Sequence, residues 1–226
     1  MGLFQQIYKK MPFLDKRLEF ISLIKDNSTV LDLGSGRGIL LKEIMPFNPS
    51  IKYVAVDLFD FSDVMPPGVA FTQRDISQDS LPFADESFDG IILNHVLEHL
   101  PDTRHALKEC RRVLKKGGLI YIETPSNRTI FLPYLPFKSS KSRKLVQCWN
   151  FYDDPTHIRP YTSYSLFRLL SENNYKVLKN GIVRNPLWIL LFPFYYISGI
   201  MMNRQDLIFR NLGHIFGWSV YVVGEK

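Results

Sequence analysis

The sequence predicts a doubly wound α/β fold. Its sheet of about seven strands would be mostly parallel, with an antiparallel last strand and helices on both faces. Short apolar runs alternate with helical patterns of about ten or more residues, which is typical of parallel β-α-β units. The first run, Val30–Leu33, stops at a loop of alternating glycines and is followed by the helical run Ile39–Leu41.

The expected elements follow in order along the chain. An apolar helical face within residues 1–27 predicts a leading helix that packs on the body. The expected strands are residues 30–33, 52–57, 69–73, 88–94, 119–123, 175–183 and 218–223. Asp102 and Thr162 are suited to cap two intervening helices, and Gly117–Gly118 are expected to end the first of them.

The chain is expected to form a single domain, residues 1–226, with residues 1–27 as an N-terminal helical cap. Residues 125–160 and 185–217 depart from the strand–helix rhythm. Long excursions at the functional edge of a sheet usually cover a site. We therefore expect both to be insertions on the substrate side.

The charge balance is moderately basic, with a net charge of +6. Part of the excess is local, in a cluster formed by Lys138, Lys141, Arg143 and Lys144. Such a cluster suits anionic lipid, nucleic acid or a phosphorylated substrate, and equally a solvated loop. The two cysteines, Cys110 and Cys148, have no C-x-x-C or metal-ligand spacing, which predicts a reduced, cytoplasmic protein without a structural metal.

The stretch Leu187–Met202 is uncharged and mostly apolar. It contains Pro193 and is shorter than the roughly 20 residues that span a bilayer. The sequence leaves open whether it forms a core helix, a lid or a helix at a membrane interface. Residues 186–202 are accordingly a candidate for peripheral membrane contact.

Four expected strand ends should meet in one crevice, because the carboxyl ends of parallel strands share one edge of a sheet. These ends carry Gly34, Asp57, Asp75 and Asn94–His95. A carboxylate such as Asp57, at the end of the second strand, can accept two hydrogen bonds from the hydroxyls of a nucleoside ribose.

The glycine spacing helps to distinguish between nucleotide ligands. Dinucleotide folds use G-x-G-x-x-G/A, whereas Gly34, Gly36 and Gly38 give G-x-G-x-G, and no Gly-Lys-Ser/Thr follows as in a P-loop. Asp32 would repel a pyrophosphate but attract an ammonium group. S-adenosylmethionine carries an ammonium group and no phosphate, so it fits this loop better.

Five stretches in order resemble the class I S-adenosylmethionine-dependent methyltransferases, in the small-molecule branch (methyltransferase type 11/23-like). The stretches are Val30–Gly38, Asp57, Arg74–Ile76 with Leu81–Asp89, His95–Leu100 and Leu114–Gly118. The resemblance is close over residues 29–124 and looser from Asp154 onward. It implies a Rossmann-like fold, S-adenosyl-L-methionine as cofactor and S-adenosyl-L-homocysteine as product.

The resemblance also implies roles for residues around the methionine part of the cofactor. Gly34, Ser35 and Gly36 would touch it, and Asp32 would lie beneath it. Asn94 would flank the sulfonium. An alternative for Asp32 is a residue that only braces the loop.

At the nucleoside end, the resemblance implies that Asp57 binds the ribose hydroxyls and that Leu58 lies beside the adenine. Asp75 would accept a hydrogen bond from the adenine amino group, and the Ile76 backbone would contact the ring. The alternative for Asp57 and Asp75 is a simple role as strand-end caps.

Candidate bases are His95, His99 and His157, because an unperturbed histidine titrates near working pH. His157 is the first choice, since it directly follows the insertion expected to cover the pocket, and similar His-x-Arg-x-Tyr segments occur in the small-molecule branch. The alternative is that His157 braces the loop before the Thr162-capped helix. His95 would flank the transferred methyl group, and Arg159 would hold an anionic acceptor or form a structural ion pair.

Glu98–His99 also resemble ubiquinone-biosynthesis O-methyltransferases, in which acidic residues and a histidine hold a divalent metal. Here the earlier carboxylate position is His95, so we expect no metal. Glu98 and His99 are expected to form hydrogen bonds at a helix start instead.

The expected reaction is methyl transfer to a small or lipid/glycan-linked acceptor, with oxygen favoured over nitrogen or carbon. Three features favour an apolar or membrane-borne acceptor. They are the aromatic insertion within residues 125–160, the apolar stretch Leu187–Met202 and the basic cluster Lys138–Lys144. Two alternatives remain: a non-catalytic domain of the same fold that binds cofactor or a partner, and an RNA methyltransferase. Asn94–Leu97 lack the Asn/Asp-Pro-Pro-Tyr signature for exocyclic amines, which disfavours nucleic acid. The oligomeric state is left open.

Overall fold

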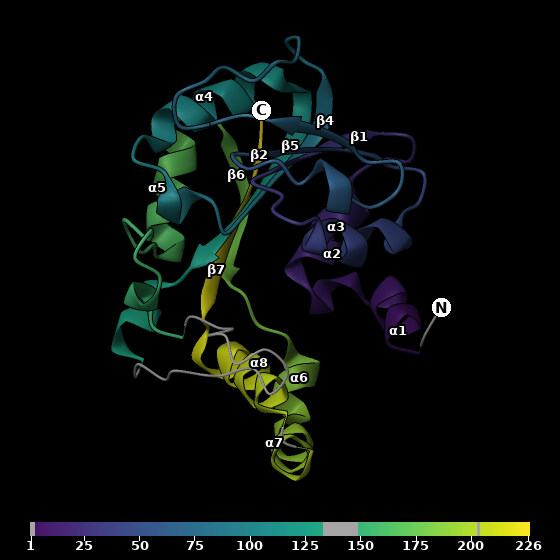
Figure 1. Cartoon of the computed structure of the whole chain (residues 1–226), viewed down its shortest axis with the longest axis vertical. Helices are drawn as coiled ribbons and strands as arrows, with labels where there is room; N and C mark the ends of the chain where they lie inside the picture. The colour runs from purple at the N-terminus through teal and green to yellow at the C-terminus, as the bar shows by residue number, and fades with distance from the viewer. Residues whose placement is uncertain (1–2, 133–148, 203) are drawn as a thin grey trace.

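The computed structural model describes residues 3–132, 149–202 and 204–226. Its strands form one seven-stranded sheet with the order β3-β2-β1-β4-β5-β7-β6 (Figure 1). The strands are β1 Thr29–Leu33, β2 Lys52–Asp57, β3 Ala70–Gln73, β4 Phe88–Asn94, β5 Leu114–Pro125, β6 Lys176–Ile182 and β7 Ser219–Glu225. The α-helices are α1 Leu3–Lys10, α2 Lys16–Leu23, α3 Ile39–Ile44, α4 Thr103–Val113, α5 Ser163–Glu172, α6 Pro186–Leu190, α7 Phe192–Met201 and α8 Gln205–Phe216. Short 3-10 helices span Pro12–Leu14, Met45–Phe47, Ser62–Val64, Leu97–His99, Asn127–Phe131 and Phe151–Asp153.

Strand directions confirm the predicted fold class. β1 pairs in parallel with β2 and β4, and the parallel pairing continues to β3 and β5. β7 is antiparallel to both of its neighbours, β5 and β6. The carboxyl ends of β1, β2 and β4 therefore share one edge of the sheet, as the sequence predicts.

The core lies on both faces of the sheet. One apolar cluster joins α4 and α5 to the sheet through side chains such as Leu107 and Leu166. The other joins α2 and α3 through Phe20 and Leu41. The apolar face expected in the leading helix is thus buried. Asp15 caps the start of α2, because its side chain accepts from the Arg17 and Leu18 backbone N–H groups.

The predicted caps are confirmed, but Gly117–Gly118 differ from the prediction. Asp102 and Thr162 cap α4 and α5 through their side chains. Helix α4 ends at Val113, and the two glycines lie inside β5. The register of β5 against β4 shifts near these glycines, and Gly117 has φ +71°. The glycines therefore form an irregularity in a strand that starts earlier than expected.

The apolar stretch 187–202 forms two short helices, because Pro193 lies in the first turn of α7 and Leu191 interrupts the helical run before it. Helices α6, α7 and α8 follow one another between β6 and β7, and α7 lies at the end of the molecule farthest from α4 (Figure 1). Within the described ranges, no helix is long and apolar enough to cross a membrane. The basic cluster at Lys138–Lys144 and Cys148 lie outside the described residues.

Candidate functional site

The glycine loop connects β1 to α3 in a conformation that requires glycine. Gly34, Gly36 and Gly38 have φ values of +79°, +49° and +67°. A Cβ atom on Gly34 would lie 2.3 Å from Val96 Cγ2, so a larger residue does not fit without displacement. The Gly34 and Ser35 N–H groups donate to the Val56 carbonyl at 2.8 and 3.1 Å, which holds the loop against the end of β2.

A cavity of about 220 Å³, here called the loop cavity, opens at this loop. It is lined by Arg17, Asp32, Gly34, Ser35, Gly36, Arg37, Ile39, Leu40 and Asn94. Among its buried polar atoms, Asp32 Oδ2, Ser35 Oγ and Asn94 Oδ1 have no hydrogen-bond partner in the described residues. Buried polar groups are normally paired, so these atoms favour a polar ligand here.

Asp32 gives the loop cavity its electrostatic character. Burial and, secondarily, the charge of Asp57 raise the pKa of Asp32 to about 7. A cationic group beside Asp32 would offset both effects. An ammonium group would be such a cation, and polar atoms of the same ligand could pair with Ser35 and Asn94.

Asp57 and Asp75 both accept hydrogen bonds from the chain itself. Asp57 Oδ2 accepts from the Gly36 N–H at 2.7 Å, and Oδ1 accepts from the Phe59 N–H at 3.1 Å. Asp75 accepts from Ser77 and Gln78. The bonds from Ser77 hold the pKa of Asp75 below its ordinary value.

The nucleoside-end residues Asp57, Leu58, Asp75 and Ile76 are not among the lining residues of the loop cavity. The end of β2 is adjacent to β3, with Asp57 opposite Gln73, and Arg74 N–H donates to the Asp57 carbonyl. Leu58 is half exposed and Ile76 is buried. Their assigned roles remain predictions.

A second cavity of about 450 Å³, here called the acceptor cavity, lies between the N-terminal helices and the segment around α6 and α8. Its polar and aromatic lining includes Tyr8, Asp15, Arg17, Glu43, His95, Glu123, Trp149, Asn185, Trp188, His214 and Trp218. Arg17 lines both cavities. Two consecutive residues that the sequence predicts as site residues also connect the cavities: Asn94 lines the loop cavity, and His95 lines the acceptor cavity.

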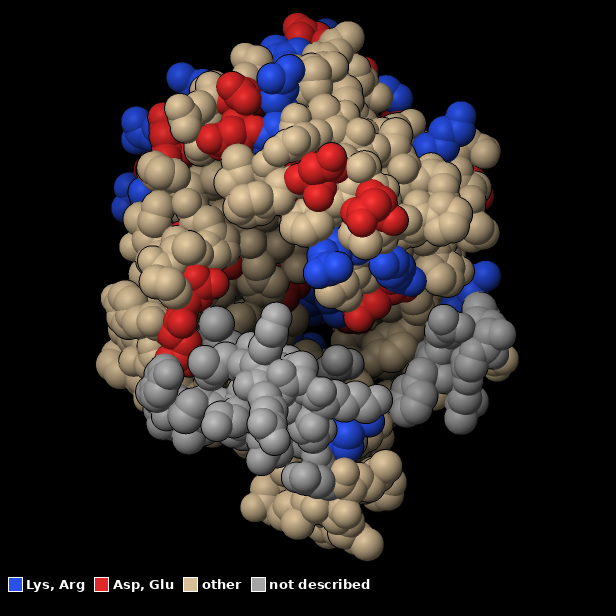
Figure 2. Space-filling view, in the orientation of Figure 1, with Lys and Arg blue, Asp and Glu red and all other residues tan. Residues whose placement is uncertain are grey.

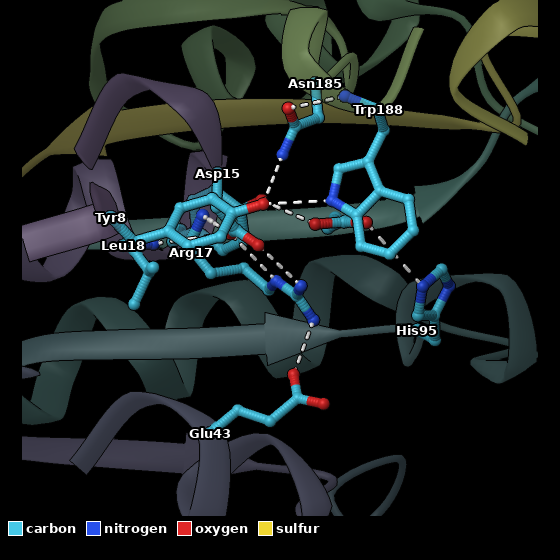
Figure 3. Close-up of polar contacts among 10 residues, drawn as sticks. Tyr8, Asp15, Arg17, Leu18, Glu43, His95, Asn185 and Trp188 are labelled. Carbon is cyan, nitrogen blue, oxygen red and sulfur yellow. Dashed lines mark hydrogen bonds and ion pairs between the residues drawn. The ribbon is translucent and has the colours of Figure 1, made fainter. Parts of the chain in front are cut away.

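Polar contacts across the acceptor cavity join distant parts of the chain (Figure 3). The Tyr8 hydroxyl accepts from Asn185 Nδ2 at 2.7 Å and from Trp188 Nε1 at 2.9 Å, which links α1 to the start of α6. Arg17 donates to Asp15 at 2.7 Å and reaches Glu43 at 3.4 Å.

His95 is held in an uncommon conformation at the end of β4. Its φ is +57°, and its N–H donates to the Glu123 carbonyl at 2.8 Å. Its Nδ1 lies 3.3 Å from Glu98 Oε1, its Nε2 lies 3.8 Å from Glu123 Oε1, and its ring centroid is 5.5 Å from that of Trp218. A non-glycine residue in this region is often held there by a functional site.

The surroundings of His95 favour its protonated form. Burial lowers the pKa of His95, but the hydrogen bond to Glu98 and the charges of Glu98 and Glu123 outweigh it, so the pKa is raised above 6.5. Glu98 is fully buried and also accepts from Thr124 Oγ1 at 2.9 Å. Glu123 accepts from the Tyr121 hydroxyl at 2.6 Å. Both carboxylates are therefore fixed in place.

His157 lies in a different environment. Its side chain is 7% exposed, and Nδ1 lies 2.7 Å from the Phe151 carbonyl, which can only accept, so Nδ1 carries the hydrogen. Its ring packs against those of Phe151 and His99. Among the residues that line the loop and acceptor cavities, His95 is present and His157 is not.

Two neighbouring predictions concern Arg159 and a metal. Arg159 donates to the Pro101 carbonyl at 2.8 Å, a contact that braces the loop.

Glu98, His99 and His157 each offer one ligand atom, and these atoms lie within 4.8 Å of one another. Thr156 contacts His99 at 2.9 Å. The expectation of no metal remains a prediction.

Sequence reasoning missed most of the acceptor cavity. Tyr8, Arg17, Trp188 and Trp218 stand in no motif, and only the fold brings them together. Glu123 offered a weak signal, because it is a carboxylate at the end of a predicted central strand.

Comparisons with known proteins show which family the chain resembles. A family model described as a methyltransferase domain matches residues 6–180. The chain is 30% identical over 136 residues to a ubiquinone biosynthesis O-methyltransferase of Rhizobium etli, covering 52% of this chain and 54% of that protein. It is 30% identical over 140 residues to a demethylmenaquinone methyltransferase of Thermotoga maritima, covering 54% and 60%. The match thus spans little more than half the length of these relatives.

Solved structures share the fold. A SAM dependent methyltransferase from Archaeoglobus fulgidus superposes with a TM-score of 0.63 at 21% identity, covering 98% of this chain and 94% of that one. The complex between the Haloferax volcanii Trm112 methyltransferase activator and a putative methyltransferase gives a TM-score of 0.65 at 15% identity, covering 98% and 92%. With a family match over most of its length, the chain belongs to the class I S-adenosylmethionine-dependent methyltransferases.

Proposed function

We propose that the chain transfers a methyl group from S-adenosylmethionine in the loop cavity to a hydroxyl group of a small or lipid/glycan-linked molecule in the acceptor cavity. The observation that carries this proposal is the adjacency of the two cavities. Asn94 lines one, His95 lines the other, and Arg17 lines both. A methyl donor and an acceptor held there would be close enough for direct transfer.

For the cofactor, Asp32 would hold the ammonium group, and Gly34, Ser35 and Gly36 would contact the methionine part. Asn94 would lie near the sulfur. At the nucleoside end, Asp57 would bind the ribose hydroxyls and Leu58 would lie beside the adenine. Asp75 would accept from the adenine amino group, and the Ile76 backbone would contact the ring. When bound, S-adenosylmethionine supplies a methyl group on a cationic sulfur.

For the acceptor, His95 would act as the general base. In its neutral form, Nδ1–H donates to Glu98, which leaves the Nε2 lone pair for a hydroxyl proton. The imidazolium formed would lie between Glu98 and Glu123, whose negative charges stabilise it. The aromatic side chains of Trp188 and Trp218 would help to exclude water from the reacting atoms.

His157 remains the alternative base. The sequence ranks it first, but the geometry favours His95, because His157 uses Nδ1 to bind the Phe151 carbonyl and lies outside the set that lines either cavity. We propose that His157 chiefly orders the loop around Phe151.

The chain is proposed to work as a single domain, residues 1–226, in a cytoplasmic setting. The predicted cap 1–27 supplies Tyr8 and Arg17 to the acceptor cavity, segment 125–160 supplies Trp149, and segment 185–217 supplies Trp188. The names of the curated relatives refer to ubiquinone and menaquinone, which makes apolar ring-bearing molecules the first acceptors to test.

A turnover assay tests this proposal. The protein is mixed with S-adenosylmethionine and a panel of phenols, catechols and quinols, and formation of S-adenosylhomocysteine is measured with and without each acceptor. We expect acceptor-dependent product with the wild type. Tight cofactor binding without turnover on any hydroxyl acceptor, together with methylation of an amine or of RNA, would reject the proposed acceptor.

A further inference from the structure

Helix α7 and its flanks form an exposed apolar surface, here called the α7 surface. Its side chains are exposed by 76% at Leu190, 64% at Phe194, 60% at Ile200 and 81% at Met201. In Figure 2, the visible side of the lower protrusion of the molecule carries no charged residue. Contiguous apolar surface of this kind is rare on soluble proteins and usually marks an interaction site.

Internal packing accounts for only one side of α7. Gly199 is buried, and a Cβ atom there would lie 2.6 Å from Ile208 Cγ1, so α7 packs closely on α8 at this point. The other side, with Phe194, Ile197 and Ile200, is exposed to solvent. Of the options that the sequence left open, a fully buried core helix is therefore wrong for this stretch.

The charge pattern around the α7 surface suits anionic lipid. Residues 185–202 contain no charged residue, while exposed Arg184 and Arg204 stand on either side. Tyr196 adds an exposed amphipathic ring of the kind that lies at headgroup depth, and Phe194 adds an exposed apolar ring. An apolar helix between cations can dock on a bilayer by combining apolar burial with attraction to anionic headgroups.

Helix α7 is joined in the chain to two helices that line the acceptor cavity. Trp188 on α6 and His214 on α8 line that cavity, and α7 connects these two helices. We propose that the α7 surface docks on an anionic phospholipid bilayer and so brings the acceptor cavity to a membrane-borne acceptor. The second half of this statement rests on the proposed function, whereas the docking does not.

Vesicle flotation tests the docking. Wild-type protein is mixed with vesicles of phosphatidylcholine, alone or with phosphatidylglycerol, and the floated fraction is measured at low and high salt. We expect flotation mainly with the anionic vesicles and less at high salt. The double variant Ile200→Glu/Met201→Glu should reduce the floated fraction roughly tenfold or more, because it places charges on the docking side.

The matched control is Tyr164→Glu on α5, which is 66% exposed and away from α7 (Figure 1). It should float like the wild type. Equal flotation of wild type and double variant, or none with the wild type, overturns the inference. A wild-type dimer in light scattering that the double variant converts to a monomer also overturns it, because the surface then serves a second copy.

Titration with S-adenosylmethionine separates this inference from the proposed function. Both variants should bind the cofactor with wild-type affinity. Loss of flotation by the double variant, with intact cofactor binding and turnover on a water-soluble acceptor, supports the docking and shows that docking is separable from catalysis. If the wild type floats with anionic vesicles but does not bind the cofactor, the proposed function is rejected and the docking still holds.

Discussion

At the residue scale, Asp32 links cofactor binding to pH. Its pKa in the folded chain, about 7, lies above the ordinary 3.8, so folding favours the protonated form. Its contribution to the free energy of unfolding is therefore full below pH about 4 and is lost as pH rises through about 7. In the proposed function, the cofactor ammonium pairs with the ionised form of Asp32.

We expect affinity for S-adenosylmethionine to rise between pH about 5.5 and 7, with release of a proton near pH 6.5. Calorimetry in buffers of different ionisation enthalpy measures both the affinity and the number of protons released. Asp32→Asn should bind weakly and show no such pH dependence. An Asp32→Asn curve that keeps the wild-type slope would show that another group titrates.

His95 is the second residue whose role can be isolated. His95→Gln should lower kcat by about 10²- to 10⁴-fold and leave the cofactor Kd within about twofold, because the side chain acts on the acceptor proton. His157→Ala in a folded protein should lower kcat by less than about tenfold. A larger loss of kcat in His157→Ala than in His95→Gln would make His157 the base.

The pH profile offers an independent check on His95. Its pKa is raised above 6.5, so the rate should increase as pH rises through a value above 6.5 and then level off. Glu98→Gln removes the charge that raises this pKa, and the inflection should move to lower pH. An inflection that does not move would separate the titrating group from Glu98.

At the element scale, the glycine loop can be tested by a matched pair. Gly34→Ala should destabilise the fold by roughly 1–3 kcal/mol, since φ is +79° and the added carbon meets Val96. Gly36→Ala has φ +49° and nothing within 4 Å of its added carbon, so it should destabilise less. Urea unfolding measures both, and equal losses would contradict the packing argument.

Element prediction from sequence worked where local patterns decide the structure. The alternating runs predicted the seven strands, and Asp102 and Thr162 predicted two helix starts, because a cap depends on a few adjacent residues. Gly117–Gly118 were misassigned to a helix end. Their role depends on how β5 pairs with β4, which is a non-local contact.

At the scale of the whole molecule, the acceptor cavity could not be predicted. Tyr8 and Trp188 are joined by a hydrogen bond across 180 positions, and they meet only because the N-terminal helices and α6 close over the same end of the sheet. His95 was predicted as a site residue from its strand-end position. The proposed preference for His95 over His157 depends on which of the two lines the acceptor cavity, which only the fold reveals.

Binding of S-adenosylmethionine in the loop cavity is the central claim for the molecule as a whole, and calorimetric titration with the cofactor tests it most directly. We expect one molecule bound per chain, and for Asp57→Ala an affinity weaker by about 1.5–3 kcal/mol, since a charged group loses its hydrogen bonds. No heat and no thermal shift with the wild type would contradict the claim.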